Sequence, residues 1–405
     1  MKSNDFWSLP ALAVAFLGVV SGSLQATPLV TINMVEVGDP GNFSANATNA
    51  SSWGSTYGYG AVGYDYRIGT YEVTIGQYNT FLNAVAASDP FELYNTSMGT
   101  DLNIAGITRS GSPGTYTYSV DGSGDRPITY VSFYNAAMFT NWLHNGATTS
   151  SSITSGAYQI STGTVTQVSR SSNVATLTSS GHTLSVGDQV TVSGTTGYNV
   201  TSVVTAVTTN TFSFAQTGSD QVATAASGNM TGASATRDAG ATWWLPSEDE
   251  WVKAAYYDPG TGNYSLHANQ SNSITTNTIG AAGGANYFDG DFATTQSGYL
   301  PTQNYLTDVG AYGLTTSFYG TYDQGGNVWE WNEAILGTTG FSRGLRGGSW
   351  DNDELELRAS SFSGIEPSYE SYAFGFRVAS VPEPSAAMLM MLGGGALLLR
   401  KRRRG

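Results

Sequence analysis

The amino-acid sequence predicts a loop-rich fold that mixes helices and strands and carries a small all-β module as an insertion. Three observations support this prediction. The chain has 50 glycines among 405 residues, and glycine is used where the backbone takes a positive φ or passes close to a neighbour. Several segments show the apolar spacing of amphipathic helices. A stretch rich in Ser, Thr, Val and Gly, residues 161–228, interrupts that pattern.

Three helices are predicted from their first residues. Thr74 precedes a segment whose apolar residues recur with helical spacing, and Ser132 stands between a strand-like run and an amphipathic stretch. Both are predicted N-caps, because Ser and Thr side chains accept hydrogen bonds from the free N–H groups of a first helical turn. Ser247 and Glu250 have the spacing of a capping box. The acidic residues at 248–250 suit the positive end of a helix dipole, so we interpret them as a helix start rather than a catalytic pair.

The interruption at residues 161–228 has the composition of a small β-sandwich or barrel. It contains few charged residues, and turn signals that include Gly181, Gly187 and Gly194 separate its β-type runs. We interpret this module as a spacer on a surface loop, with a binding role as the alternative. The predicted strands are Thr164–Val168, Val174–Thr178, Gln189–Val192, Ser202–Val207 and Thr211–Phe214.

Composition and charge exclude several classes of function. The chain has no cysteine and a formal net charge of -14. The absence of cysteine excludes disulfides, thiolate metal sites and cysteine nucleophiles. The acidic charge repels nucleic acid and anionic lipid and favours cations, so we expect no nucleic-acid partner.

The N-terminus predicts export. An apolar stretch at residues 7–22 follows Lys2 and leads into small and polar residues up to Ala26. This is the pattern of a secretory signal peptide, here residues 1–26, which signal peptidase removes after Ala26. An uncleaved membrane anchor is the alternative, although the apolar run is short for a bilayer span of about 20 residues.

Residues 381–405 predict a second envelope signal. Pro382, Glu383 and Pro384 precede an apolar run at residues 385–399, and a basic cluster at residues 400–404 follows. A short transmembrane segment with this flank keeps its positive end in the cytoplasm. The tail resembles the PEP-CTERM sorting signal of Gram-negative bacteria. The resemblance implies cleavage near Pro-Glu-Pro by an exosortase, which converts an inner-membrane-anchored intermediate into a protein of the outer surface or extracellular matrix. A plain C-terminal anchor is the alternative.

Six segments spread over residues 66–380 carry a second resemblance. They are Tyr71–Tyr78, Arg126–Phe133, Trp244–Trp251, Gly325–Trp331, Arg346–Trp350 and Phe374–Val378. Together, and in this order, they resemble the formylglycine-generating enzyme, or sulfatase-modifying factor, family. The resemblance implies a compact α+β fold related to C-type lectins, with few regular elements and much ordered loop. Residues 27–65 are then an N-terminal lead-in.

The same resemblance implies two calcium sites. Calcium takes about six to eight oxygen ligands from flexible loops that mix carboxylates with backbone carbonyls. The residues that match the first site are Asp323, Gly326, Val328 and Glu330. Those that match the second are Asn286 and the Tyr287 carbonyl, with Asp289, Asp291 and Tyr299 as candidate partners. The alternative is that these carboxylates are solvated turn residues.

The oxidase chemistry of the family is not expected in this chain. That chemistry uses two thiols that bind copper(I), a metal that prefers soft thiolate ligands. The positions that match the thiols are Asn352 and Leu357, so no copper cofactor is expected. Other branches of the superfamily use a histidine iron site, which here would require His144, His182 and His267 to converge. His182 lies in the insertion, and we do not expect such a site.

An acidic run follows the Gly-Gly-Ser-Trp motif. Its alternation predicts a strand with one acidic, solvated face. The alternatives are cation or ligand binding in the former active-site cleft, and a hydrolytic carboxylate pair. The candidate cleft residues are Arg346, Trp350, Asp351, Asp353 and Glu354, and Glu356 continues the run.

These expectations favour a non-catalytic, calcium-stabilised binding module over an enzyme. Its scaffold would present aromatic residues to a glycan or an extracellular matrix partner, although most large aromatics are expected in the core. The alternative is a metal-dependent oxidoreductase or another enzyme of the superfamily that uses a non-cysteine site. Fold resemblance alone does not assign an activity. The candidate aromatics are Trp243, Trp244, Trp329, Trp331 and Trp350.

Overall fold

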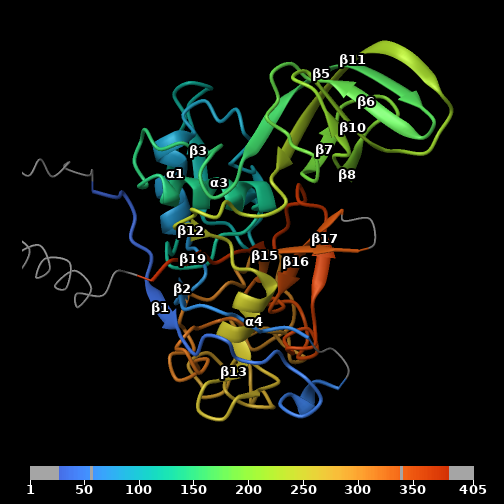
Figure 1. Cartoon of the computed structure of the whole chain (residues 1–405). Coiled ribbons are helices and arrows are strands. Elements are labelled where there is room, and N and C mark those ends of the chain that lie inside the picture. Colours follow the sequence, from blue (N-terminus) through green and yellow to red (C-terminus); the bar gives the residue numbers. More distant parts are fainter. Residues whose placement is uncertain (1–26, 55–57, 338–340, 383–405) are drawn as a thin grey trace, which may run out of the picture.

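The computed structural model of the chain describes residues 27–54, 58–337 and 341–382. Figure 1 shows a body of short strands, helices and long loops, and a group of strands, β5 to β11, that extends from one end of it. The predicted signal peptide and the tail from Glu383 onward lie outside the described residues. Within the described ranges, no helix is both long enough and apolar enough to cross a membrane.

Three helices of the body start where the sequence predicts. In α1 (Ile75–Val85), the Thr74 side chain accepts from the Gln77 N–H, and the Gln77 side chain accepts from the Thr74 N–H. Ser132 caps α3 (Phe133–His144) by accepting from the Asn135 N–H. Ser247 and Glu250 form the predicted capping box at α4 (Glu248–Tyr256). A single-turn helix α2 (Ser97–Thr100) and a 3-10 turn (Ser51–Trp53) are the other helical elements of the described residues.

The main core lies around α1 and α3, which pack side by side (Figure 1). Every residue of α3 from Phe133 to Leu143 is buried, so this helix runs through the core rather than over its surface. The aromatic rings of Phe81, Phe139 and Trp142 contact one another with centroids 5.3 to 5.7 Å apart. Large aromatics therefore supply much of the packing, as the composition predicts.

Two small sheets organise the body. The first has the order β1-β2-β19-β12, all antiparallel, and β1 comes from the predicted lead-in. The second has the order β17-β16-β15-β18, in which β15 and β18 run parallel. Strand bounds in the first sheet are Met34–Val37 (β1), Tyr66–Gly69 (β2), Trp243–Trp244 (β12) and Ala379–Ser380 (β19). Those in the second are Trp329–Leu336 (β15), Ser342–Arg346 (β16), Ser363–Ile365 (β17) and Phe374–Gly375 (β18).

Two hairpins complete the body. The first joins β3 (Ile107–Ser110) to β4 (Thr117–Val120), and the second joins β13 (Tyr257–Asp258) to β14 (Asn263–Tyr264). Both are antiparallel. The described body is thus sheet-rich with few helices and much loop, which is consistent with an α+β class.

The strands that extend from the body form one seven-stranded sheet in the order β8-β7-β11-β5-β6-β10-β9. They have a hydrophobic cluster of their own, which includes Leu177, Phe212 and Phe214. The run predicted at Ser202–Val207 is split into two strands, and β11 was not predicted. Whether this sheet is an independent inserted module stays a prediction. The strands are Ile160–Ser171 (β5), Val174–Thr178 (β6), Gln189–Ser193 (β7), Val200–Val203 (β8), Ala206–Val207 (β9), Thr211–Ala215 (β10) and Gln221–Ala233 (β11).

Candidate functional site

The loop that precedes β15 coils tightly against the segment around Asn286. Asp323, Gly326 and Asn327 all have positive φ, at 57°, 92° and 61°. A Cβ on Gly326 would lie 2.3 Å from the Asn286 carbonyl oxygen, so only glycine fits this approach. The Asn327 N–H donates to the same carbonyl at 2.8 Å. The fold therefore brings together the two segments that were predicted to bind calcium.

Asp323 is partly buried at the start of this loop. Its Oδ2 accepts a hydrogen bond from the Gly310 N–H at 2.5 Å. Burial raises the pKa of the Asp323 carboxyl to about 6, while the Gly310 N–H and Arg377 act in the opposite direction. An oxygen ligand for a cation is available at this position.

Glu330, the second predicted carboxylate ligand, lies in an ion pair with Arg377. Arg377 Nε and Nη2 donate to Glu330 Oε2 and Oε1, each at 2.6 Å, and the Trp251 indole N–H donates to Oε2 at 2.8 Å. Both charged side chains are buried. A cation at the predicted site would therefore share Glu330 with an arginine.

Glu72 joins this site, although the sequence analysis gave it no role beyond its place in the Tyr71–Tyr78 segment. Its Oε1 accepts from Asn327 Nδ2 at 3.3 Å, and its Oε2 is buried without a hydrogen-bond partner. Burial raises the pKa of Glu72 well above its ordinary value, and Asp323 adds to the shift. We call Glu72, Asp323 and Glu330 the buried carboxylate cluster. Its signal in the sequence was the acidic residue of the Tyr71–Tyr78 segment.

The second predicted calcium site is less well assembled. Asn286 Nδ2 donates to the Tyr305 carbonyl and to Asn327 Oδ1, both at 3.0 Å, so this side chain joins loops to one another. Tyr299 lies elsewhere, with its hydroxyl donating to Asn103 Oδ1 at 2.6 Å. Asp291 accepts from Asn277 Nδ2 at 2.8 Å. In the part of the chain that the structure describes, no group of three or more His, Cys, Asp or Glu side chains is arranged to hold a metal ion.

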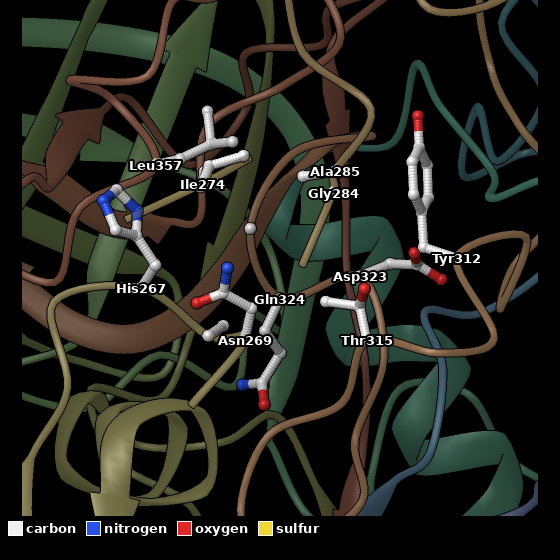
Figure 2. A pocket seen from close by; sticks show the side chains of 12 residues that line it. His267, Asn269, Ile274, Gly284, Ala285, Tyr312, Thr315, Asp323, Gln324 and Leu357 are labelled. Atoms are coloured by element: carbon white, nitrogen blue, oxygen red, sulfur yellow. The ribbon is translucent and has the colours of Figure 1, made fainter. Parts of the chain in front are cut away.

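A small pocket adjoins Asp323 (Figure 2). Its volume is about 20 Å³, which is room for one water molecule or ion. Figure 2 shows Asp323 and Tyr312 on one side of the pocket and His267 and Leu357 on the other. His267 Nε2 lies 2.8 Å from Glu354 Oε1, and burial lowers the pKa of this histidine.

The predicted cleft residues do not share one cleft. Arg346 is buried, and its guanidinium binds Glu248 and the carbonyls of Ala359 and Ser361. Glu354 pairs with His267 and with Arg358, whose Nη2 lies 2.9 Å away. Both residues therefore have structural partners of their own, away from Trp350 and Asp351.

The predicted acidic strand after Trp350 is wrong, because residues 351–359 form successive turns. Asp353 Oδ1 accepts from the Leu355 N–H at 2.8 Å, and the Leu357 N–H donates to the Glu354 carbonyl at 3.2 Å. Aspartate commonly caps its own turn in this way, and this local hydrogen bonding competes with strand formation. The Glu356 and Asp353 carboxyl groups share a hydrogen bond; burial first, and then this neighbour, raise the pKa of Glu356.

Trp350 and Asp351 open onto a pocket of about 580 Å³. We call it the aromatic pocket. Sequence reasoning selected only Trp350 and Asp351 for a cleft, and considered Tyr299 as a metal ligand. The other lining residues come from three further segments of the chain. The full lining is Asp101, Asn103, Phe292, Tyr299, Trp350, Asp351 and Tyr372.

Comparison with known proteins places this chain in a family. Residues 33–381 match the sulfatase-modifying factor enzyme 1-like domain. The chain belongs to the sulfatase-modifying factor family. No curated protein matches the chain.

Three solved structures are similar to this family member. Treponema denticola variable protein 1 has 17% sequence identity and a TM-score of 0.42, over 87% of this chain and 96% of that chain. CarF has 16% identity and a TM-score of 0.42, over 87% of this chain and 99% of that chain. PvdO from Pseudomonas aeruginosa has 15% identity and a TM-score of 0.37, over 86% of this chain and 94% of that chain.

The two positions that were predicted to match the thiols of the sulfatase-modifying factor family, Asn352 and Leu357, make structural contacts in this chain. Asn352 Oδ1 accepts from the Trp329 indole N–H at 2.7 Å, from the Ser349 N–H at 3.0 Å and from the Ser349 hydroxyl at 2.7 Å. Leu357 has no exposed surface and packs with Ala285 and Tyr287. One position is thus a hydrogen-bond acceptor that joins two segments, and the other is a core residue.

The remaining candidates are distributed through the fold. Four of the five candidate tryptophans are buried, and Trp243 packs half-buried against the main core, which confirms the expectation that most would be core residues. His144 Nδ1 accepts from the Thr242 N–H at 3.0 Å beyond the end of α3. His182 stacks edge-on against Phe212 beside the seven-stranded sheet. Each of these two histidines thus has its own local contacts, and neither contact involves His267.

Proposed function

We propose that this member of the sulfatase-modifying factor family is a calcium-stabilised binding module that does not carry out the thiol oxidation of the family. The observation that carries the proposal is the use of Asn352 and Leu357 as structural residues. A chain without cysteine cannot form the mixed disulfide or the copper(I) thiolate on which that oxidation depends. We therefore propose that the scaffold binds a partner such as a glycan or an extracellular matrix component.

The buried carboxylate cluster supports calcium at the first site. Glu72 and Glu330 are each 1% exposed, and Asp323 is partly buried beside them. Arg377 forms an ion pair with Glu330 and lies close enough for Glu72 and Asp323 to act on its charge. Buried charges are stable only when they are paired or bind metal. One divalent cation would balance the two excess carboxylates.

The oxygen set also fits calcium chemically. Glu72 has a buried oxygen without a hydrogen-bond partner, and the Asp323 carboxylate and the carbonyls of Gly326 and Val328 would add further oxygens. Calcium accepts such mixed, irregular oxygen sets, whereas copper(I) does not. These residues would hold the ion and fix the loop that leads into β15.

Export is part of the same proposal. The signal-peptide pattern at residues 1–26 and the Pro382–Pro384 motif support a route through signal peptidase and an exosortase, with the body delivered to the outer surface or extracellular matrix of a Gram-negative bacterium. A surface location suits a module that depends on calcium, because the calcium concentration outside the cytoplasm is high enough to fill the weak calcium sites of extracellular modules.

Metal analysis of the full-length chain, purified in detergent and dialysed against metal-free buffer, tests the proposal. We expect one or two calcium ions per chain and no stoichiometric copper or iron. Asp323→Asn should lose one calcium, whereas Asp121→Asn, on an exposed loop, should lose none. Stoichiometric redox metal, or oxidation of a sulfatase cysteine peptide by the chain, would refute the proposal.

A second candidate function has one observation in its favour. Asp353 and Glu356 share a hydrogen bond, the arrangement of two carboxylates that exchange a proton in acid–base catalysis. An enzyme of this kind should show hydrolysis of a glycan or ester substrate that Glu356→Gln abolishes. Loss of that activity with an unchanged unfolding curve would favour the enzyme over the binding module.

A further inference from the structure

The aromatic pocket has an unusual combination of side chains. Four of its lining residues are aromatic and two are aspartates, and no Lys, Arg or His lines it. Tyr299 is 57% exposed and Tyr372 is 39% exposed, whereas Trp350 is 4% exposed. Two tyrosines thus stand at the opening, with the tryptophan beneath them.

The aromatic rings are held in place by one another. Trp350 stacks on Tyr305 at an angle of 10° and a centroid distance of 4.8 Å. Tyr305 in turn stacks with Tyr299 at 20° and 5.8 Å. Phe292 lies 4.4 Å from the Tyr305 ring. Because each ring is fixed by its neighbours, the pocket needs little ordering when a ligand binds.

The two aspartates are anchored by hydrogen bonds from neighbouring groups. Asp101 accepts from the Tyr130 hydroxyl at 2.9 Å and from the Asn103 N–H at 3.1 Å. Asp351 accepts from the Tyr372 hydroxyl at 2.7 Å and from the Ser349 hydroxyl at 2.6 Å. All of these donors are neutral, and neither aspartate forms an ion pair with another described residue. Each carboxylate has lone pairs left for a ligand.

The charge of the pocket selects among ligands. Two uncompensated carboxylates repel an acidic sugar and attract a cation. Aromatic faces attract a cation as well, and they also accept the apolar face of a sugar ring. A sugar that carries a protonated amine satisfies both kinds of side chain at once, whereas a neutral sugar satisfies only the aromatic ones.

We infer that the aromatic pocket binds amino-sugar residues of a polysaccharide whose amines are free. The sugar ring packs on Tyr299 and Tyr372, and its ammonium group pairs with Asp101 and Asp351. This inference rests on the proposed function, because it names the ligand of the binding module. No bond is made or broken, and the ligand is held by charge, ring contacts and hydroxyl donation to the carboxylates.

The test compares two hexasaccharides that differ only in their amines. The full-length chain in detergent, at a mildly acidic pH where sugar amines are protonated, is titrated with a glucosamine hexamer and with its N-acetylated counterpart. Titration calorimetry and tryptophan fluorescence report binding. We expect the free-amine hexamer to bind at least about tenfold more tightly, because acetylation removes the charge.

Three variants and one control assign the binding to this pocket. Asp351→Asn keeps the shape of the side chain and should weaken the free-amine hexamer about tenfold while leaving the acetylated hexamer unchanged. Tyr299→Ala should weaken both hexamers, and Tyr299→Phe should restore them. Asp121→Asn, an exposed aspartate outside the pocket, should change neither. Circular dichroism of each variant shows that it is folded.

The outcomes separate this inference from the proposed function. Equal binding of the two hexamers, or full binding by Asp351→Asn, would overturn the inference. Equally tight binding of hexalysine would show that the pocket binds the amines of proteins as well, and would overturn the inference that its ligand is a polysaccharide. In all of these cases calcium retention and the absence of oxidase activity would still support the proposed binding module. A chain that binds no calcium but still binds the free-amine hexamer would instead refute the calcium site and leave the sugar inference standing.

Discussion

Glu330 and Arg377 form a two-point ion pair in the interior of the protein, with both N–O distances at 2.6 Å. Arg377 also donates to the carbonyls of Gly69 and Tyr322, each at 2.9 Å. One guanidinium therefore joins β15 to β2 and to the loop that carries Asp323. The pair is a structural centre of the fold as well as the neighbour of the proposed calcium site.

Removal of this arginine should be severely destabilising. Arg377→Met leaves Glu330 buried without its partner, and breaking a buried ion pair from one side costs about 3 to 5 kcal/mol. Urea unfolding followed by tryptophan fluorescence measures the loss. Arg358→Met is the matched control, because its pair with Glu354 is about one-third exposed on both sides and should cost less than about 1 kcal/mol. Equal losses in the two variants would contradict the role given to Arg377.

Glu72→Gln should have opposite effects with and without calcium. In excess chelator, the variant relieves repulsion among three buried carboxylates and should raise the free energy of unfolding by about 1 kcal/mol. In saturating calcium, it removes charge that the ion needs and should lower the stability that calcium adds.

Thermal melts of both proteins in chelator and in calcium measure this reversal. Glu36→Gln, an exposed glutamate on β1, is the control and should behave like the unmodified chain in both buffers. A Glu72→Gln variant that is less stable in both buffers would show that Glu72 has a purely structural role.

Glu370 predicts the pH dependence of stability. Burial raises the pKa of its carboxyl from 4.5 to about 7, and Glu92 and Asp89 add to the shift, whereas the Asn95 amide opposes it. The folded state thus holds a proton that the unfolded state releases, so this contribution to stability is complete at low pH and is lost as the pH rises through about 7. Arg109 is the neighbouring cation, and it pairs with Asp89 at 3.3 Å.

Glu370→Gln isolates this effect. The variant should remove a loss of about 2 to 3 kcal/mol between pH 5 and pH 8. Free energies of unfolding, measured in urea at several pH values, give the slope for each protein. An unchanged slope in the variant would show that Glu370 does not carry the dependence.

Leu357→Ala tests whether the second thiol position has become part of the core. Truncation of a fully buried leucine costs about 2 to 5 kcal/mol. Leu355→Ala provides the control two residues away, since Leu355 is 54% exposed and its truncation should cost less than about 0.5 kcal/mol. Comparable small losses of stability in both variants would show that Leu357 is not a core residue that stabilises the fold.

The sequence was sufficient for features that depend on nearby residues. Thr74, Ser132 and Ser247 cap the helices they were predicted to cap, because capping needs only a side chain and the next turn of backbone. The acidic residues after Trp350 were wrongly predicted to form a strand, because the Asp353 side chain accepts a hydrogen bond from the Leu355 N–H of its own turn. Alternation in the sequence does not reveal that local hydrogen bond.

Features that depend on distant segments were not predicted. The aromatic pocket joins Asp101, Phe292, Trp350 and Tyr372, which lie far apart in the chain, and no spacing rule connects them. Glu72 was missed for the same reason, since only the fold places it beside Asp323. Strand β11 was missed because its Ser, Ala, Gly and Asn residues have weak strand preference, and pairing with β5 and β7 overrides that preference.

The position of β19 has a mechanical consequence. Ala379 and Ser380 lie between β2 and β12, paired to both, and the Val381 N–H donates to the Thr242 carbonyl at 3.1 Å. Tension applied at residue 381 is therefore shared at once between the first strands of the body and the segment that leads into α4. A protein tethered through this end would resist shear through its whole first sheet rather than peel from one edge.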